Sequence, residues 1–101
     1  MPNKYSLTYL PIAQDDLTAI VDWIAKDNPT RALTFVEALA KRIGHLESHP
    51  LMGRVPRHEK LKRLGYHALV LENYLVFYVV QSKAVEIHRV LHGSRLLDEI
   101  L

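Results

Sequence analysis

Hydrophobic and polar positions alternate with two different periods in the first half of the chain. In residues 4–10 every second residue is apolar, which is typical of a half-buried strand. In residues 11–27 apolar side chains recur every three or four positions, which predicts a helix. Asn28 and Pro29 suit the N-cap and first position of a second helix, which continues with the same period until Pro50 ends it. Since almost nothing separates the two helices, we expect an antiparallel helical hairpin.

The second half of the chain changes to a strand pattern after an irregular stretch. Pro50, Gly53 and Pro56 break regular structure, so residues 49–62 are expected to form no element. Strands are then predicted at residues 64–71, 74–80 and 84–91, with short turns at 72–73 and 81–83. In the last strand, alternation separates two faces, with Val85, Ile87 and Leu91 on one and Glu86 and His88 on the other.

The elements combine into one expected architecture. Gly93 ends the last strand, and Ser94 suits the N-cap of a short C-terminal helix. The last three strands form an antiparallel meander, the first strand joins their sheet, and the helical hairpin packs on one face. This predicts an α+β fold, a two-layer β-α-α-β-β-β arrangement with an antiparallel sheet. The most buried residues are expected to include Phe35, Leu39, Val76 and either Tyr78 or Phe77.

The composition suits one small domain and excludes several classes of protein. The chain has 101 residues, of which 49% are hydrophobic and 24% are charged, so we expect a single domain over residues 1–101. It contains no cysteine, which excludes disulfides, thiol nucleophiles and cysteine-based zinc sites. No apolar run reaches the roughly 20 residues of a membrane span, and the N-terminus does not resemble a signal peptide. We therefore expect a cytoplasmic protein that makes no membrane contact.

Motifs of common enzymes are also missing from the sequence. There is no G-x-S-x-G elbow, no P-loop and no G-x-G-x-x-G turn. Asp15 and Asp16 are neighbours on a helix and point apart, so they do not form the carboxylate pair of an acid–base site. Because they lie early in the helix, we expect them to complement the positive end of its dipole. His45 and His49 have the spacing of two metal ligands on one helix, but no third ligand lies nearby. We therefore predict neither a metal nor a cofactor.

The basic residues of the chain are concentrated in one short segment. Residues 54–67 carry five Lys and Arg against Glu59 alone, which gives this segment a net charge of +4 in a chain whose total is +2. Such a cluster indicates a site for an anionic partner, while the alternative is a loop that only faces water. If the strand ends converge, further basic groups join it in a concave patch that could bind or cleave RNA. The candidates are Arg54, Arg57, Lys60, Lys62, Arg63, His67, Arg89, His92 and Arg95.

Four fragments, in this order, resemble the RelE/ParE superfamily of toxins from bacterial type II toxin–antitoxin systems. The family pattern A..DL..I..YI...NP..A is matched by AQDDLTAIVDWIAKDNPTRA, and L..P..GR is matched by LESHPLMGR. The strand pattern Y.VFY.V is matched by LGYHALVLENYLVFYVV, and V.I..VLH..R is matched by VEIHRVLHGSR. The resemblance covers nearly all of the chain, and the fold that it implies agrees with the one read from periodicity.

The resemblance implies a toxin of a plasmid-stabilisation module that a cognate antitoxin protein neutralises. ParE-like members inhibit DNA gyrase, whereas RelE-like members cleave mRNA on the ribosome with Lys, Arg and often a C-terminal Tyr or His. The chain has no tyrosine after Tyr78, and its ending VLHGSR looks more like ParE, so the resemblance favours a gyrase inhibitor. A non-toxic relative or a plain nucleic-acid-binding domain is the remaining alternative.

The two kinds of toxin imply different site residues. The ParE-like case has no favoured catalytic residue, and its target-binding residues are Arg54, Arg57, Arg63, Arg95, Leu96 and Leu97. The RelE-like case is an endoribonuclease that uses Lys60, Lys62, Arg63, His67, Arg89 and His92. Promoter DNA would be contacted only indirectly, through the antitoxin. A second copy of the chain could pair through an edge strand or the helical hairpin, so a homodimer is possible.

Overall fold

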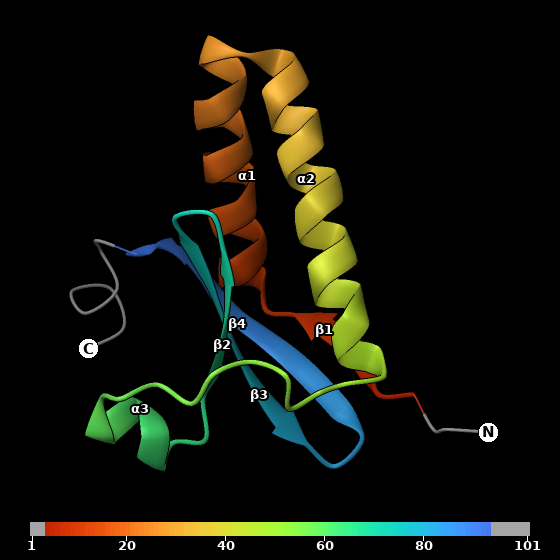
Figure 1. The fold of residues 1–101 in the computed structure, drawn as a ribbon, viewed down its shortest axis with the longest axis vertical. Coiled ribbons are helices and arrows are strands. Elements are labelled where there is room, and N and C mark those ends of the chain that lie inside the picture. The colour runs from red at the N-terminus through yellow and green to blue at the C-terminus, as the bar shows by residue number, and fades with distance from the viewer. Residues whose placement is uncertain (1–3, 94–101) are drawn as a thin grey trace.

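The computed structural model describes residues 4–93 and contains the expected elements in the expected order (Figure 1). The predicted C-terminal helix, with its cap at Ser94, lies outside the described residues. Two further short helices, η1 and α3, occur between the hairpin and the sheet. The elements are β1 (Ser6–Tyr9), α1 (Pro11–Asp27), α2 (Pro29–Gly44), the 3-10 helix η1 (His45–Glu47), α3 (Glu59–Arg63), β2 (His67–Leu71), β3 (Tyr74–Gln81) and β4 (Ala84–His92).

The four strands form one sheet in the order β1-β4-β3-β2. The predicted antiparallel meander of β2, β3 and β4 is confirmed, but β1 pairs with β4 in parallel, so the sheet is mixed rather than antiparallel throughout. The parallel pairing follows from the path of the helical hairpin, which leaves the end of β1 and brings the chain back to the start of β1. There the Tyr5 N–H donates to the Glu47 carbonyl at 2.9 Å. The following strand β2 therefore begins near the same end as β1.

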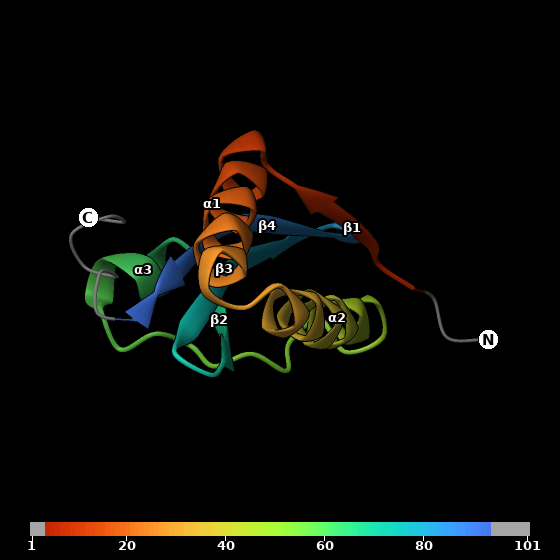
Figure 2. The ribbon, with the colours of Figure 1, turned by 90° about the horizontal axis from the view of Figure 1, so that it is seen from above.

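Asn28 and Pro29 join the two long helices as the sequence predicts. The Asn28 N–H donates to the Ile24 carbonyl at the end of α1, and its side chain accepts from the Arg31 N–H at the start of α2. Figures 1 and 2 show the two helices side by side, with α3 well apart from them. The α-helix ends at Gly44 instead of continuing to Pro50, and η1 carries the apolar stripe on to the fully buried Leu46.

The main core lies between the helical hairpin and one face of the sheet, here called the hairpin face. Phe35, Leu39, Val76 and Tyr78 belong to it and are at most 3% exposed, which confirms their predicted burial. Phe77 is equally buried but points to the opposite face. There it packs with Ala68 of β2 and Leu61 of α3 in a second cluster, so this face is called the α3 face.

The helix α3 occupies a stretch that was expected to be irregular. The His58 ring accepts from the Lys60 N–H at 3.2 Å and so caps the helix, which ends before Gly65 with its positive φ of 84°. Five residues are too few to display helical periodicity, which explains why the pattern does not reveal α3. As a consequence β2 begins at His67 rather than at residue 64. Within residues 4–93 no helix is long and apolar enough to cross a membrane.

A bulge in β4 changes the faces of its last residues. Ile87 pairs with Tyr78 and Arg89 pairs with Phe77, so His88 is an extra residue without a partner in β3. Beyond the bulge Val90 joins the main core, while Leu91 pairs with Leu75 of the α3-face cluster. The prediction that Leu91 shares a face with Val85 and Ile87 is therefore wrong, because one inserted residue reverses the alternation.

Candidate functional site

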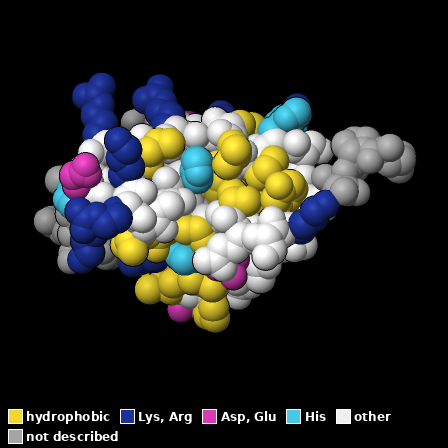
Figure 3. Space-filling view, turned by 90° about the horizontal axis from the view of Figure 1, so that it is seen from below, with side chains coloured by type: hydrophobic (Ala, Val, Ile, Leu, Met, Phe, Trp, Pro, Cys, Tyr) yellow, Lys and Arg dark blue, Asp and Glu magenta, His cyan; other side chains and the backbone are white. Residues whose placement is uncertain are grey.

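Five basic residues lie along the loop and the short helix that precede β2. Arg54 and Arg57 belong to the loop, and α3 carries Lys60, Lys62 and Arg63. All five are exposed, and within residues 4–93 none of them forms an ion pair, unlike Arg31 and Arg89 elsewhere. Figure 3 shows Lys and Arg side chains gathered on the side that carries α3. The five charges are thus available to an anionic partner.

The loop in front of α3 is held to the sheet at two neighbouring residues. Arg54 exchanges two backbone hydrogen bonds with Ala68 of β2, each 2.8 Å long. The Gly53 N–H donates to the buried Tyr78 hydroxyl at 2.9 Å. Burial raises the pKa of the Tyr78 phenol above its usual value, and the bond from Gly53 opposes part of that rise. The basic segment therefore starts from a fixed point at the edge of the sheet.

The structure does not bring the predicted RelE-like set together. His67 stacks on Tyr78, with ring centroids 5.4 Å apart, so it lies on the hairpin face. His92 contacts Tyr74 edge-on at 5.4 Å, and Tyr74 also packs against the main core. The three basic residues of α3 belong to the other face, where Leu61 packs. The two histidines of the predicted RelE-like set thus lie on the opposite face of the sheet from the basic residues of α3.

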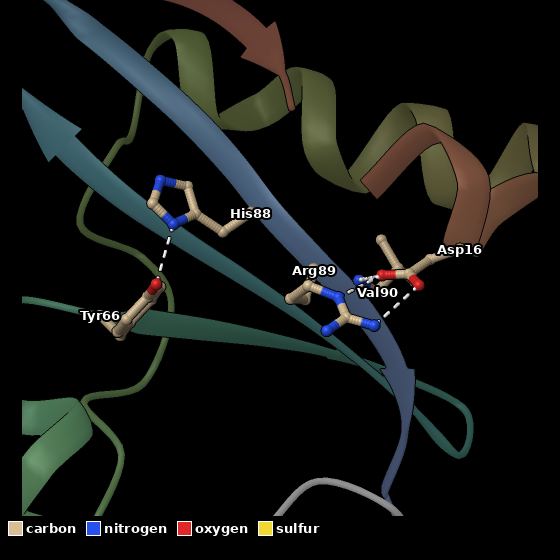
Figure 4. A network of polar contacts seen from close by, with 5 residues as sticks. All are labelled: Asp16, Tyr66, His88, Arg89 and Val90. Carbon is tan, nitrogen blue, oxygen red and sulfur yellow. Dashed lines mark hydrogen bonds and ion pairs between the residues drawn. The ribbon is translucent and has the colours of Figure 1, made fainter. Parts of the chain in front are cut away.

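Arg89, another predicted site residue, is held by Asp16 of α1. Its guanidinium donates to both carboxylate oxygens, at 2.8 and 3.0 Å, and the Val90 N–H donates to the same carboxylate at 3.0 Å (Figure 4). The pair is largely buried, with the two side chains 19% and 13% exposed. It lies where β1 stops pairing with β4 at Ile87, so Asp16 bonds to the strand edge that β1 leaves open. Asp15 and Asp16 lie past the first turn of α1, which contains no acidic residue, so the expectation that they complement the helix dipole is wrong.

Sequence reasoning missed a chain of three polar side chains on the α3 face. The Tyr66 hydroxyl lies 2.9 Å from His88 Nδ1, and His88 Nε2 lies 3.2 Å from a carboxylate oxygen of Glu86 (Figure 4 shows the first contact). In a neutral ring Nε2 carries the hydrogen, because an ionised carboxylate can only accept, and Nδ1 then accepts from Tyr66. Such a chain can move a proton between Tyr66 and His88.

One part of this hydrogen-bonded group of side chains could be predicted from the sequence. Alternation placed Glu86 and His88 on one face, as observed. Tyr66 lies just before β2 and 22 positions away from His88, and no spacing rule connects them. It reaches the histidine by packing against Phe77, with ring centroids 6.4 Å apart. Within the described residues no group of three or more His, Asp or Glu side chains could hold a metal ion, so His45 and His49 gain no third ligand.

The profile of one protein family matches nearly the whole chain. The family is described as the ParE toxin of the type II toxin–antitoxin system parDE, and the match covers residues 7–97. The chain belongs to this family. The match confirms the resemblance to the RelE/ParE superfamily that the four sequence fragments indicate.

Three of the solved structures similar to this ParE-family toxin are of toxin–antitoxin systems. The chromosomal ParDE system of P. aeruginosa matches with a TM-score of 0.71 at 24% identity, covering 89% of this chain and 97% of the other. The complex RelBE2 of Mycobacterium tuberculosis matches with a TM-score of 0.59 at 25% identity, covering 88% and 91%. The RelB–RelE complex of Methanococcus jannaschii matches at 0.56 and 16% identity, covering 93% and 99%. No curated protein gives a significant match.

Proposed function

We propose that this ParE-family toxin arrests bacterial growth in the cytoplasm by binding and inhibiting DNA gyrase. The family match over residues 7–97 is the observation that carries this proposal. The unpaired charges of residues 54–63 support it, because exposed cations without intramolecular partners speed and orient binding to a partner's carboxylates. We assign target binding to Arg54, Arg57 and Arg63, together with Arg95, Leu96 and Leu97, which lie outside the described residues.

The same proposal includes a cognate antitoxin that neutralises the toxin. It is supported by the similar structures, which are of ParDE and RelBE toxin–antitoxin systems. Antitoxin segments of this kind can order on binding and add a helix or strand to their partner. Contacts to promoter DNA then belong to the antitoxin. Co-expression of the antitoxin is expected to restore growth to cells that express this chain.

The deciding experiment incubates the purified protein with gyrase and relaxed plasmid, beside a ribosome-programmed mRNA cleavage assay. We expect supercoiling to be lost while the mRNA stays intact, and we expect growth arrest in cells to be accompanied by the SOS DNA-damage response. Codon-spaced cuts in the mRNA with normal supercoiling would contradict gyrase inhibition.

The second candidate is a RelE-like endoribonuclease, and the Tyr66–His88–Glu86 chain is the observation that favours it. Tyr66 packs in the same cluster as Leu61 of α3, so a proton-transfer group and the helix with three basic residues share one face. RNA cleavage needs both, an acid–base group for the 2′-hydroxyl and cations for the phosphate. If this candidate is right, His88→Ala should lower the rate of mRNA cleavage about 100-fold or more. If gyrase is the target, His88→Ala should leave inhibition unchanged.

A further inference from the structure

Three aliphatic side chains are exposed beside the point where the loop is held to the sheet. Leu51 is 67% exposed, Met52 is 40% exposed and Val55 is 53% exposed. None of them belongs to either hydrophobic cluster. Of nine large hydrophobic side chains that are exposed within residues 4–93, three thus lie within five consecutive positions, here called the 51–55 patch. These side chains lie outside the hydrophobic core, and grouped exposure of this kind marks interaction surfaces.

The backbone of the 51–55 patch is held in place although its side chains face water. The Met52 N–H donates to the His49 carbonyl at 3.2 Å, and the next two residues, Gly53 and Arg54, bond to Tyr78 and Ala68. A Cβ atom at Gly53 would lie only 2.6 Å from the Tyr78 hydroxyl, so the loop approaches the core as closely as it can. A surface that is ordered before binding loses little conformational entropy on binding.

Basic residues lie within the 51–55 patch and directly after it along the chain. Arg54 lies inside it, Arg57 follows two residues later, and the three cations of α3 come next along the chain. Figure 3 shows this end of the molecule, with hydrophobic side chains across the middle and Lys and Arg side chains toward α3. An apolar centre with a charged rim is the usual arrangement of a protein-binding surface.

The chemistry of the 51–55 patch favours a protein over a nucleic acid. Single-stranded nucleic acids bind on aromatic side chains that stack with the bases. Residues 48–65 contain no Phe, Tyr or Trp, and the exposed side chains are aliphatic. Aliphatic side chains bind apolar side chains of a partner, and the neighbouring cations bind carboxylates.

We propose that the 51–55 patch docks onto an acidic segment of the toxin's protein target, with aliphatic side chains of that segment against Leu51 and Val55. This inference rests on the proposed inhibition of gyrase, and it extends the target-binding surface beyond the cations Arg54, Arg57 and Arg63. The cations steer the partner to the surface, and the aliphatic contacts hold it there.

The test separates the apolar contribution from the charge. The double variant Leu51→Ser/Val55→Ser keeps every charge, and its matched control is Leu33→Ser on α2, where the side chain is also 67% exposed. The double variant Arg57→Glu/Lys62→Glu reverses two charges, and its control is Lys83→Glu in the exposed β3–β4 turn. Each purified variant is titrated against gyrase in the supercoiling assay, and circular dichroism checks that it is folded.

We expect Leu51→Ser/Val55→Ser to raise the concentration for half-inhibition by about tenfold or more, and Leu33→Ser to change it less than about twofold. The charge-reversal variant should raise the concentration for half-inhibition by a similar factor at low salt. At high salt the increase should be smaller, because salt screens exposed charges. If the folded patch variants inhibit gyrase as strongly as the wild type does, the docking inference is wrong, while the proposed inhibition of gyrase stands. A wild-type protein that does not inhibit gyrase would overturn the proposed function, and with it this inference.

Two further outcomes also count against a target-docking patch. If the aliphatic variant loses binding to the antitoxin but still inhibits gyrase, the patch belongs to the antitoxin interface. If a short DNA duplex binds the wild type, and only the charge-reversal variant loses both this binding and gyrase inhibition, the surface binds nucleic acid.

Discussion

At Gly53 the hydrophobic core and the candidate binding loop come within hydrogen-bonding distance. The buried Tyr78 hydroxyl accepts from the Gly53 N–H at 2.9 Å, and the Ala68 carbonyl would lie 2.9 Å from a Cβ at this position. Both neighbours are fixed, one by burial and the other by strand pairing, so neither can give way at low cost. A single residue without a side chain therefore sets how closely the 51–55 patch follows the sheet.

Gly53→Ala is expected to lower the free energy of unfolding by about 1–3 kcal/mol, because the added methyl group overpacks a filled site. Urea-induced unfolding measures the change. Gly44→Ala is the matched control, since no atom lies within 4 Å of its added Cβ and it closes a helix. That control should gain up to about 1 kcal/mol. A Gly53→Ala protein as stable as the wild type would show that the loop is not held by this contact.

Tyr78 also makes stability depend on pH in the alkaline range. Burial raises the pKa of Tyr78, and burial raises the pKa of Tyr9 in the same direction. A group whose pKa is higher in the folded state than in the unfolded state holds its proton more tightly when folded. Its stabilisation is therefore complete below the unfolded pKa of about 10 and is lost as the pH rises through the folded pKa.

We expect the free energy of unfolding to fall as the pH rises above about 10, measured by urea titrations between neutral and alkaline pH. Tyr78→Phe should make this fall shallower without abolishing it, because Tyr9 still titrates. At neutral pH the same variant should lose about 1–3 kcal/mol, since the Gly53 N–H is left without its acceptor. An identical alkaline slope in the variant and the wild type would contradict the role of Tyr78.

At the scale of elements, the open edge of β4 explains why α1 carries a buried carboxylate. β1 pairs with β4 only as far as Ile87, and the strand continues to His92. Asp16 accepts from the Val90 N–H and from the Arg89 guanidinium, so one side chain satisfies the strand edge and the neighbouring cation together. This contact fixes α1 on the sheet and keeps Arg89 from contributing a free charge to the candidate site.

Asp16→Ala is expected to lower the free energy of unfolding by about 3–5 kcal/mol, because Arg89 would keep a largely buried charge without this partner. Asp15→Ala is the matched control, an exposed neighbour whose loss should change stability by less than about 0.5 kcal/mol. Hydrogen exchange provides a second measurement, since the Val90 amide should exchange faster in Asp16→Ala alone. Slow exchange of Val90 in that variant would contradict the contact.

The same elements show what a sequence can and cannot predict. The hairpin was predictable because Asn28 and Pro29 act through local backbone geometry, which residue type determines. The parallel pairing of β1 depends on where the chain returns after two helices, and periodicity carries no such information. The bulge at His88 is equally hidden, because the apolar residues on both sides of it fit an unbroken strand. The contacts of Tyr66 and Asp16 depend on these non-local features, and so they could not be predicted.

At the scale of the whole molecule, charge and apolar surface meet at the end that lies away from the hairpin tip. The hairpin and the sheet build the main core, while the loop and α3 add the second cluster and the unpaired cations. The described chain ends at Gly93, whose N–H donates to the Asn73 carbonyl at 2.8 Å. Of the six residues assigned to target binding, three follow the last described residue. The other three, Arg54, Arg57 and Arg63, belong to residues 54–63, here called the cationic segment. These two groups can be tested separately.

Replacing Arg95, Leu96 and Leu97 in the 101-residue chain tests the group that follows Gly93. If these residues bind the target, the triple variant Arg95→Ala/Leu96→Ser/Leu97→Ser should need about tenfold more protein for half-inhibition of gyrase. Leu33→Ser again serves as the control for an exposed leucine. Thermal unfolding distinguishes binding from packing, because a residue that acts only on the target leaves the melting temperature unchanged. A melting temperature that falls together with inhibition would instead assign these residues to the stability of the fold, and the target surface would then consist of the cationic segment and the 51–55 patch.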